Sequence, residues 1–203
     1  MVFLRTVPAF ETARPLNGDG VSLRAPQLQD YPAWAELRAL SREHLVPWEP
    51  IWPRDDLTRS AFRRRLRHYG REARDDHGYA FFVFENATGR LTGGVTLSSI
   101  RRGVTQSATL GYWMGAPFAR RGAMTKAVAT LCPFVFQDLR LHRLEAATQP
   151  ANTASVRVLE KNGFEREGYA RSYLKINGVW QDHLLYALLA SDVGGAAGFG
   201  VTA

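Results

Sequence analysis

The sequence predicts a single mixed α/β domain built on a central, mostly antiparallel sheet. Its 203 residues suit one hydrophobic core. Hydrophobic residues make up 45% of the chain and charged residues 22%, which is ordinary for a folded globular protein. Helical and β periodicities follow one another in the order strand, two helices, three strands, helix, strand, helix and hairpin. That order is typical of a sheet flanked by helices.

The N-terminal part contains one short strand and one helix. Residues 1–19 are expected to form an irregular segment that ends in a turn. Alternating residues over 21–24 predict a strand. Asp30 has the position of an N-cap and Pro32 falls in the first turn, so a helix is expected to run to about Leu45.

A Trp- and Pro-rich loop, residues 47–53, ends this helix because its prolines cannot continue it. Loops on a rigid scaffold often carry binding residues. A second helix is expected over about 56–74, with an apolar stripe on its inner side. Its other faces carry many arginines. A solvated basic face explains them, and a docking surface for anions is the alternative.

The middle of the chain changes to a β period. Runs 79–85, 91–100 and 105–114 predict an antiparallel meander. A helix then opens within 117–124. Pro133 lies inside its pattern and is expected to kink or restart it.

The C-terminal part contains a strand, a helix and a hairpin. We expect the strand over 144–148 and the helix over about 152–161. The pair Asn177–Gly178 predicts a hairpin over 173–188, because Asn-Gly between β-like runs favours a tight turn. The Gly- and Ala-rich residues 191–203 are expected to form a disordered tail.

Charge and cysteine content narrow the possible functions. Lys and Arg total 26 and Asp and Glu 19, giving a net charge of +7. This surplus favours phosphate-bearing ligands, nucleic acid or acidic surfaces. The single cysteine, Cys132, excludes an intrachain disulfide and a Cys-based zinc cluster, and no metal site is predicted. No apolar run approaches a membrane span and Met1–Arg5 starts no signal peptide, so a cytoplasmic protein without membrane contact is expected.

A phosphate site is indicated where the third strand of the meander leads into a helix. Arg120, Arg121 and Gly122 stand immediately before the helix N-terminus. Unpaired backbone N–H groups and the helix dipole attract anions there, and Gly122 permits close approach. Taken alone, these residues are better explained by turn geometry and solubility, and the phosphate site is the alternative.

A second motif makes the signal specific. Residues 150–164 contain Asn152-x-x-Ser155 and end in Leu159-x-x-x-Gly-Phe. Together with the Arg/Gly loop, this segment resembles the GCN5-related N-acetyltransferase (GNAT) superfamily. That family usually has Gln or Arg where this chain has Ala119, whereas Gly122 matches. The resemblance implies a GNAT domain over residues 20–190, with two splayed parallel strands at 105–114 and 143–149.

The C-terminal part of the chain indicates a subgroup within this family. Residues 164–183 and the Pro47-Trp48-Glu49-Pro50 stretch resemble RimJ/RimL-type ribosomal-protein N-terminal acetyltransferases. The resemblance implies acetyl transfer from acetyl-CoA to the N-terminal α-amine of a protein, ribosomal in type, by a monomer or dimer. It implies cofactor contacts from Tyr112, Trp113, Met114, Arg120, Arg121, Gly122, Ala123, Met124, Thr125, Asn152, Ser155 and Lys161.

Three residues are predicted to perform the chemistry. The backbone N–H of Met114 is expected to stabilise the oxyanion. Glu49 is the candidate base, with a rim carboxylate that only attracts the ammonium form as the equal alternative; His44 is a weaker candidate. Ser155 is the candidate acid, and hydrogen bonding to the backbone of its first turn is the alternative role of its hydroxyl. The remaining histidines, among them His183, are interpreted as structural or solvated.

Two other functions remain open at this point. One is a GNAT enzyme that acetylates a small-molecule amine, which a narrow acceptor pocket with several carboxylates would favour. The other is a non-catalytic ribosome- or RNA-binding module, suggested by the charge of +7 and the arginine-rich helix.

Overall fold

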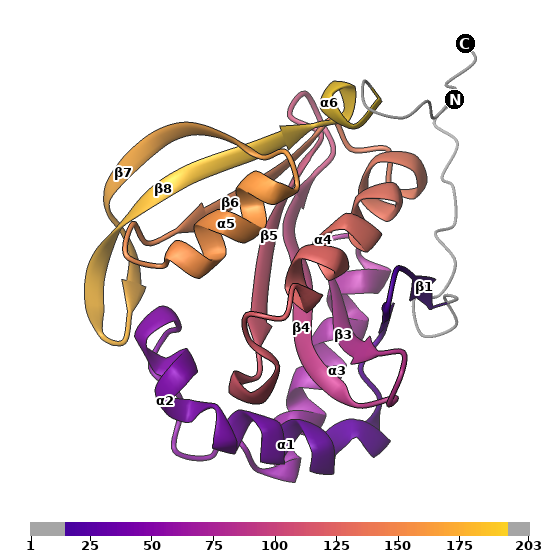
Figure 1. The fold of residues 1–203 in the computed structure, drawn as a ribbon, viewed down its shortest axis with the longest axis vertical. Coiled ribbons are helices and arrows are strands. Elements are labelled where there is room, and N and C mark those ends of the chain that lie inside the picture. The colour runs from indigo at the N-terminus through magenta and orange to yellow at the C-terminus, as the bar shows by residue number, and fades with distance from the viewer. Residues whose placement is uncertain (1–14, 195–203) are drawn as a thin grey trace.

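The fold is one eight-stranded sheet with helices on both faces, in a computed structural model that describes residues 15–194 (Figure 1). The strand order is β1-β2-β3-β4-β5-β6-β8-β7. Only β5 and β6 are parallel neighbours, and all other pairs are antiparallel. The predicted fold class is therefore confirmed. The strands are β1 (Leu16–Asn17), β2 (Val21–Arg24), β3 (Tyr79–Glu85), β4 (Leu91–Arg101), β5 (Ser107–Met114), β6 (Arg143–Thr148), β7 (Glu165–Ile176) and β8 (Val179–Leu189).

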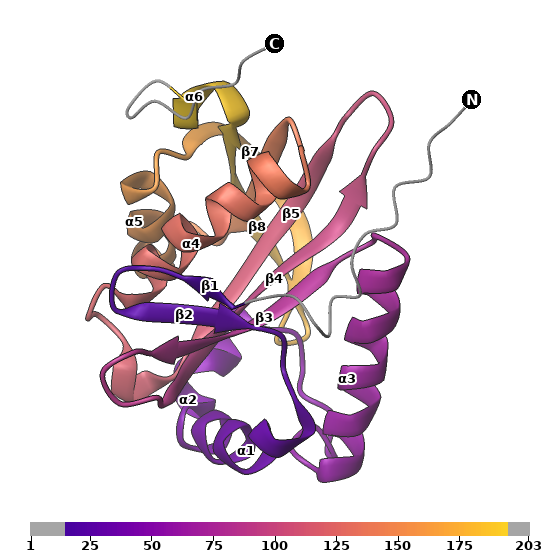
Figure 2. The same cartoon turned by 90° about the vertical axis from the view of Figure 1, so that its right-hand side faces the viewer.

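The helices divide between the two faces of the sheet (Figure 2). They are α1 (Tyr31–Leu40), α2 (Arg42–Leu45), α3 (Arg59–Arg74), α4 (Ala123–Pro133), α5 (Thr153–Lys161) and α6 (Ala190–Gly194). On β3, Phe81 packs edge-on against Phe134 beyond α4, while its neighbour Phe82 stacks on Phe62 of α3. Successive residues of a strand point to opposite faces. Hence α4 and α5 cover one face, and α1 and α3 cover the other.

Two helices differ from the expected boundaries. The helix predicted from Asp30 to Leu45 is interrupted at Ser41, which is fully buried and whose Oγ accepts a hydrogen bond from Ala116 N at 2.9 Å. A tertiary contact therefore divides α1 from α2. The helix predicted from residue 56 begins at Arg59, because Thr58 is its N-cap and accepts a hydrogen bond from Ala61 N.

Pro133 was predicted to kink or restart its helix, and the structure confirms this. The α-helix ends at that residue and continues as a short π-helical turn, η5 (Phe134–Asp138). The buried side of α4 is apolar, and Cys132 lies within it as a free thiol.

The two ends of the chain are only partly described. Residues 1–14 and 195–203, which include most of the predicted irregular segment and tail, lie outside the described residues. Leu16 and Asn17 pair with β2, and residues 190–194 are helical, so regular structure extends further at both ends than the sequence indicated. Within residues 15–194, no helix has both the length and the apolar character needed to cross a membrane.

Candidate active site

The parallel strands β5 and β6 separate in the middle of the sheet. Their pairing runs from Ser107 opposite Arg143 to Leu110 opposite Ala146 and stops there. Beyond that point β5 stays paired with β4 as far as Met114, and β6 stays paired with β8 as far as Thr148. The two strands therefore diverge while each keeps its outer partner, and a cleft opens between them.

Met114 points its backbone N–H at this opening. Gly115 N donates to Thr92 O at 2.8 Å, so Gly115 faces the β4 side. Hydrogen-bonding directions alternate along a strand. The N–H of Met114 therefore faces the opposite edge, where β6 has diverged.

A cavity of about 180 Å³ lies at the divergence. It collects residues from both strands, from the start of α5, from β8 and from the loop after α2. Its lining is Trp48, Leu110, Gly111, Tyr112, Ala146, Ala147, Thr148, Gln149, Asn152, Ser155, Leu159 and His183. Three of the predicted site residues, Tyr112, Asn152 and Ser155, are thus brought together.

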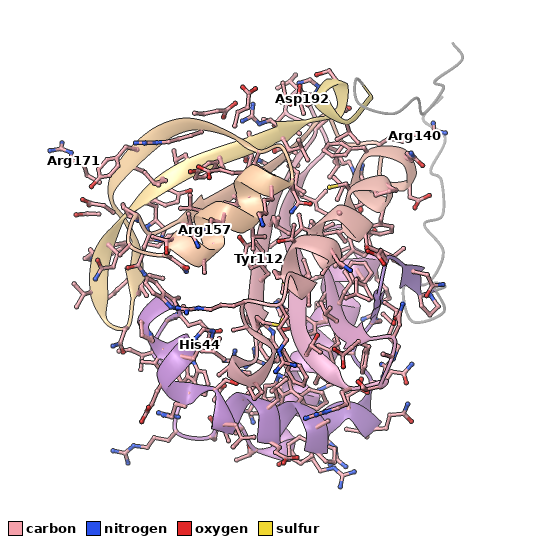
Figure 3. All side chains as sticks on the ribbon, in the orientation of Figure 1. His44, Tyr112, Arg140, Arg157, Arg171 and Asp192 are labelled. Atoms are coloured by element: carbon pink, nitrogen blue, oxygen red, sulfur yellow. The ribbon has the colours of Figure 1, made fainter. Side chains whose placement is uncertain are left out.

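A hydroxyl pair joins β5 to α5. Tyr112 Oη and Ser155 Oγ are 2.8 Å apart, and Figure 3 shows Tyr112 beside α5. Asn152 caps α5, its Oδ1 accepting a hydrogen bond from Ser155 N at 3.1 Å. Burial raises the pKa of Tyr112 to about 12, against a smaller lowering by its bond to Ser155. Tyr112 therefore stays protonated at neutral pH, and the pair can supply a proton to the cleft.

The Arg/Gly loop, expected to be an anion site, leads directly into α4. Arg120 and Gly122 adopt left-handed φ values of 63° and 79°, which turn the chain into the helix. The first helical bond runs from Lys126 N to Gly122 O, so the N–H groups of residues 123–125 have no acceptor within the helix. A Cβ at Gly122 would meet nothing within 4 Å. Arg120 and Arg121 are exposed and form no ion pair within the described residues.

Three other residues predicted to contact the cofactor have side chains that point away from the cleft or lie further from it. The side chain of Met124 is buried in the core. The Trp113 indole packs on the other face, against Phe82 and over Arg38. Lys161 is exposed at the end of α5, six residues or about 9 Å of helix beyond Ser155.

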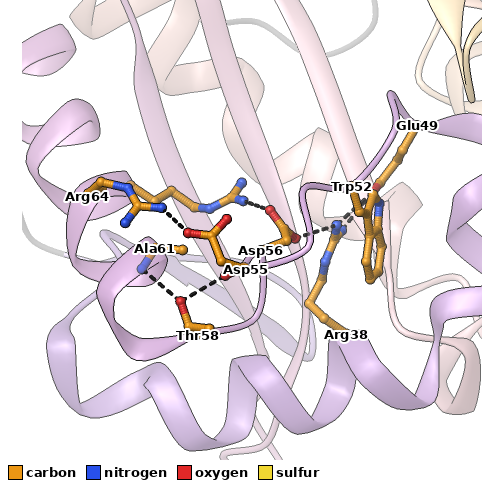
Figure 4. A network of polar contacts seen from close by, with 9 residues as sticks. Arg38, Glu49, Trp52, Asp55, Asp56, Thr58, Ala61 and Arg64 are labelled. Atoms are coloured by element: carbon orange, nitrogen blue, oxygen red, sulfur yellow. Dashed lines mark hydrogen bonds and ion pairs between the residues drawn. The ribbon is translucent and has the colours of Figure 1, made fainter.

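Glu49, in the Trp-rich loop, belongs to a network of ion pairs and hydrogen bonds (Figure 4). Its two carboxylate oxygens accept bonds of 2.7 Å from Arg38 Nη1 and Nη2, and Trp52 Nε1 donates another of 2.7 Å. The Arg38 guanidinium lies over the Trp52 ring at 4.1 Å. These three bonds hold both carboxylate oxygens against Arg38 and Trp52. The geometry gives Glu49 a structural role in holding the loop.

The same network fastens the loop to α3. Asp56 accepts from Arg65 at 2.7 Å and lies 3.9 Å from Arg38. Asp55 pairs with Arg64 at 2.5 Å on the exposed side. The loop is therefore fixed to both helices on its face of the sheet.

Sequence reasoning missed three parts of the cavity wall. His183, interpreted as structural or solvated, is buried and lines the cavity. Trp48 and Gln149 join it, and Gln149 Nε2 donates to Pro47 O at 3.1 Å across the mouth of the cleft. The polar run Gln181-Asp182-His183 was the available signal, but alternation alone does not tell which face of β8 meets the cleft.

A splayed parallel pair beside an anion-binding helix N-terminus defines the acyl-CoA N-acyltransferase class of fold. The family model described as "Acetyltransferase (GNAT) domain" matches residues 21–165. The chain therefore belongs to the GNAT family of acetyltransferases, as the sequence motifs indicated.

Relatives of this chain are N-acetyltransferases. It is 37% identical over 177 residues to the probable N-acetyltransferase YjcK of Bacillus subtilis, covering 87% of this chain and 98% of that protein. It is 31% identical over 167 residues to the ribosomal protein uS5-alanine N-acetyltransferase of Escherichia coli, covering 81% and 86%.

A solved structure confirms the fold over nearly the same length. Mycobacterium smegmatis RimJ in complex with CoA-disulfide superimposes with a TM-score of 0.82 at 32% identity, covering 89% of this chain and 88% of that one. This chain is an N-acetyltransferase of RimJ/RimL-like character.

Proposed function

We propose that this enzyme transfers an acetyl group from acetyl-CoA to the N-terminal α-amine of a protein, ribosomal in type. The observation that carries the proposal is the β5–β6 cleft, where a hydroxyl pair joins β5 to α5 and the Met114 N–H of β5 faces the opening. Its likeness to the uS5-alanine acetyltransferase and to the RimJ complex supports both the donor and the acceptor.

The residues around the cleft fit acetyl-CoA. The free N–H groups at the start of α4 and the open space at Gly122 suit its pyrophosphate, and Arg120 and Arg121 add charge. The divergent edges of β5 and β6 expose strand backbone to its amide-bearing arm. When bound, acetyl-CoA supplies the activated acyl group.

The chain then performs three tasks. Met114 N–H binds the carbonyl oxygen and stabilises the negative charge that develops on it. Ser155, backed by Tyr112, donates a proton to the departing sulfur. The cleft holds the acceptor amine close to the acyl carbon, which removes most of the entropic cost of the encounter.

An α-amine needs less help from a general base than a lysine amine does. Its pKa of about 7.7–8.0 leaves on the order of a tenth neutral at pH 7, whereas a lysine amine at about 10.4 is neutral less than about once in a thousand. None of the residues that line the cavity is a carboxylate, although a site for polyamines or aminoglycosides would need several.

Exposed apolar side chains near the cleft suit a flexible peptide. Trp180 on β8 is 60% exposed, and Ile51 in the Trp-rich loop is 66% exposed. The two segments meet, because Asn177 N donates to Glu49 O at 2.9 Å and Gly178 lies against Ile51. A polypeptide that enters beside the hairpin would contact both.

The exposed face of α3 supports action near ribosomal RNA in the cytoplasm. Its arginines at four-residue spacing form a ridge, and within the described chain they have no acidic partners. Like charges at this spacing destabilise a helix slightly, so a polyanion would stabilise the ridge. The residues are Arg59, Arg63, Arg67 and Arg71.

The test is an acetyl-transfer assay across peptides that differ in their N-terminal residue, run beside small amines and N-terminally blocked peptides with a free lysine. We expect transfer to free N-terminal amines and none to blocked peptides. Faster transfer to a small amine than to every peptide would contradict the proposal.

A further inference from the structure

His183 occupies the cleft wall in a way that suits a proton acceptor. It lies on β8, is 3% exposed, and lines the same cavity as Tyr112 and Ser155. Among the residues that line this cavity it is the sole imidazole, and none of the others carries a carboxylate, an ammonium or a guanidinium group. Tyr112 holds its proton to about pH 12 and is suited to donation rather than acceptance.

One hydrogen bond sets the tautomer of His183. Its Nδ1 lies 3.0 Å from Gln181 O. A carbonyl oxygen only accepts, so Nδ1 carries the hydrogen and Nε2 of the neutral ring carries the lone pair. The Nδ1 contact is the only side-chain hydrogen bond of His183 within residues 15–194. The ring is thus oriented by the backbone with its basic nitrogen unoccupied.

His183 and Ser155 lie on opposite faces of the sheet. Tyr186, three residues along β8, faces α5 and lies 3.4 Å from Glu160 through its hydroxyl. Because side chains alternate along a strand, His183 points to the other face, where Trp48 and the Trp-rich loop lie. Ser155 is on α5 itself. A base and an acid placed on opposite sides of the cleft match the opposite directions of amine attack and thiolate departure.

The ring is supported by packing, and Asp182 beside it interacts with it by charge without a hydrogen bond. Tyr173 of β7 meets it edge-on at 5.8 Å between ring centroids. Asp182, the adjacent residue, is turned to the other side, where it accepts bonds from Tyr169 Oη and Ser172 N. Glu49 is committed to Arg38 and Trp52. No carboxylate is hydrogen-bonded to His183 within the described residues, so nothing competes for a proton at Nε2.

We propose that Nε2 of His183 accepts the proton that the acceptor amine loses during acetyl transfer. The amine nitrogen forms a bond to the acetyl carbon, and the carbon–sulfur bond breaks. The nitrogen's proton passes to His183, while the sulfur takes a proton from Ser155. His183 later releases its proton to solvent, and the Ser155–Tyr112 pair regains one. The assignment rests on N-acetyl transfer and not on which amine is acetylated.

His183→Asn is the informative substitution, because an asparagine amide can keep the donor to Gln181 O but supplies no base. We expect kcat at pH 7 to fall about 100-fold, as for the loss of a general base, with an unchanged KM for acetyl-CoA. The deficit should narrow as the pH rises past the pKa of the acceptor amine, which then arrives already neutral. His142→Asn, an exposed histidine outside the cleft, should leave kcat unchanged.

Two results would overturn the assignment. One is a kcat of His183→Asn within twofold of the wild type at pH 7. The other is a loss that stays constant across pH and comes with a raised KM for acetyl-CoA, which indicates packing alone. If His183→Asn does not fold, His183→Gln is measured in its place by the same pH series. Wild-type transfer to small amines but not to peptides would refute the proposed acceptor while leaving this test intact.

Discussion

Replacing Glu49 by glutamine separates the two roles that the sequence left open for this carboxylate. Arg38 is 6% exposed, and its only hydrogen-bond partner within the described residues is Glu49. Glutamine preserves the shape but replaces one accepting oxygen by an NH₂ group, which faces a donor of either Arg38 or Trp52. The substitution therefore removes the hydrogen-bonded counter-charge of a buried guanidinium and leaves only Asp56, 3.9 Å away.

The expected loss of stability follows from burial. Removing one partner of a buried ion pair costs about 3–5 kcal/mol, and the lower end applies because the Glu49 side chain is 21% exposed. For a domain of this size, about 3 kcal/mol lowers the Tm by about 6–12 °C. The neighbouring pair of Asp55 and Arg64 is half-exposed and provides a matched control. Asp55→Asn should lower the Tm far less, because water screens this exposed pair.

Thermal unfolding and acetyl transfer, measured on both variants, decide between the roles. A structural Glu49 predicts a large drop in Tm for Glu49→Gln, a small one for Asp55→Asn, and kcat within a few-fold of the wild type at a temperature where the protein is folded. A Tm unchanged by Glu49→Gln, together with a kcat reduced about 100-fold, would refute this reasoning and restore Glu49 as the base.

Four further outcomes are expected. Gly122→Glu should abolish the stabilisation by acetyl-CoA without unfolding the protein; in the wild type this stabilisation is about 2.7 kcal/mol at 100 times Kd. The uncharged variant Gly122→Gln is the control that separates the effect of charge from that of backbone strain. Micromolar acetyl-CoA affinity retained in Gly122→Glu would count against the phosphate loop. Ser155→Ala should lower kcat about tenfold with little change in acetyl-CoA affinity, and an unchanged kcat would remove Ser155 as the acid. Burial raises the pKa of Tyr112 to about 12, so the folded state keeps a proton that the unfolded chain loses near pH 10. The free energy of unfolding should therefore fall as the pH rises from about 10 to 12. In Tyr112→Phe this fall should be smaller. Burial likewise raises the pKa of Cys132 to about 12, so a thiol reagent at pH 8 should modify it only as the protein unfolds, and rapid labelling of the native protein would contradict its burial.

The sequence predicted best those features that depend on residues close together in the chain. Asn152 caps α5, as its spacing to Ser155 indicated. Gly122 takes a positive φ before α4, as a helix-initiating anion loop requires. Asn177–Gly178 forms the turn of the β7–β8 hairpin. Each of these follows from local backbone chemistry, which acts over a few residues.

Features that required a partner from elsewhere were predicted less well. Ser41 interrupts a helix because its side chain meets Ala116, 75 residues away in the sequence. Arg38 lies within an otherwise regular helix pattern, and its periodicity does not reveal that it is buried against Glu49. Glu49 was consequently chosen for its place in the Trp-rich loop, and His183 was interpreted as structural or solvated.

By itself, the sequence determined the fold class, the family and the positions of the anion loop and the α5 cap. The tertiary structure decided which carboxylate is held in an ion pair, which histidine faces the cleft and which hydroxyl pairs with Ser155. The reason is that the cleft is assembled from segments far apart in the chain, such as Pro47 and Gln149, which are 102 residues apart yet joined by a hydrogen bond. Local periodicity fixes where a strand or helix lies, whereas packing between elements fixes which atoms meet.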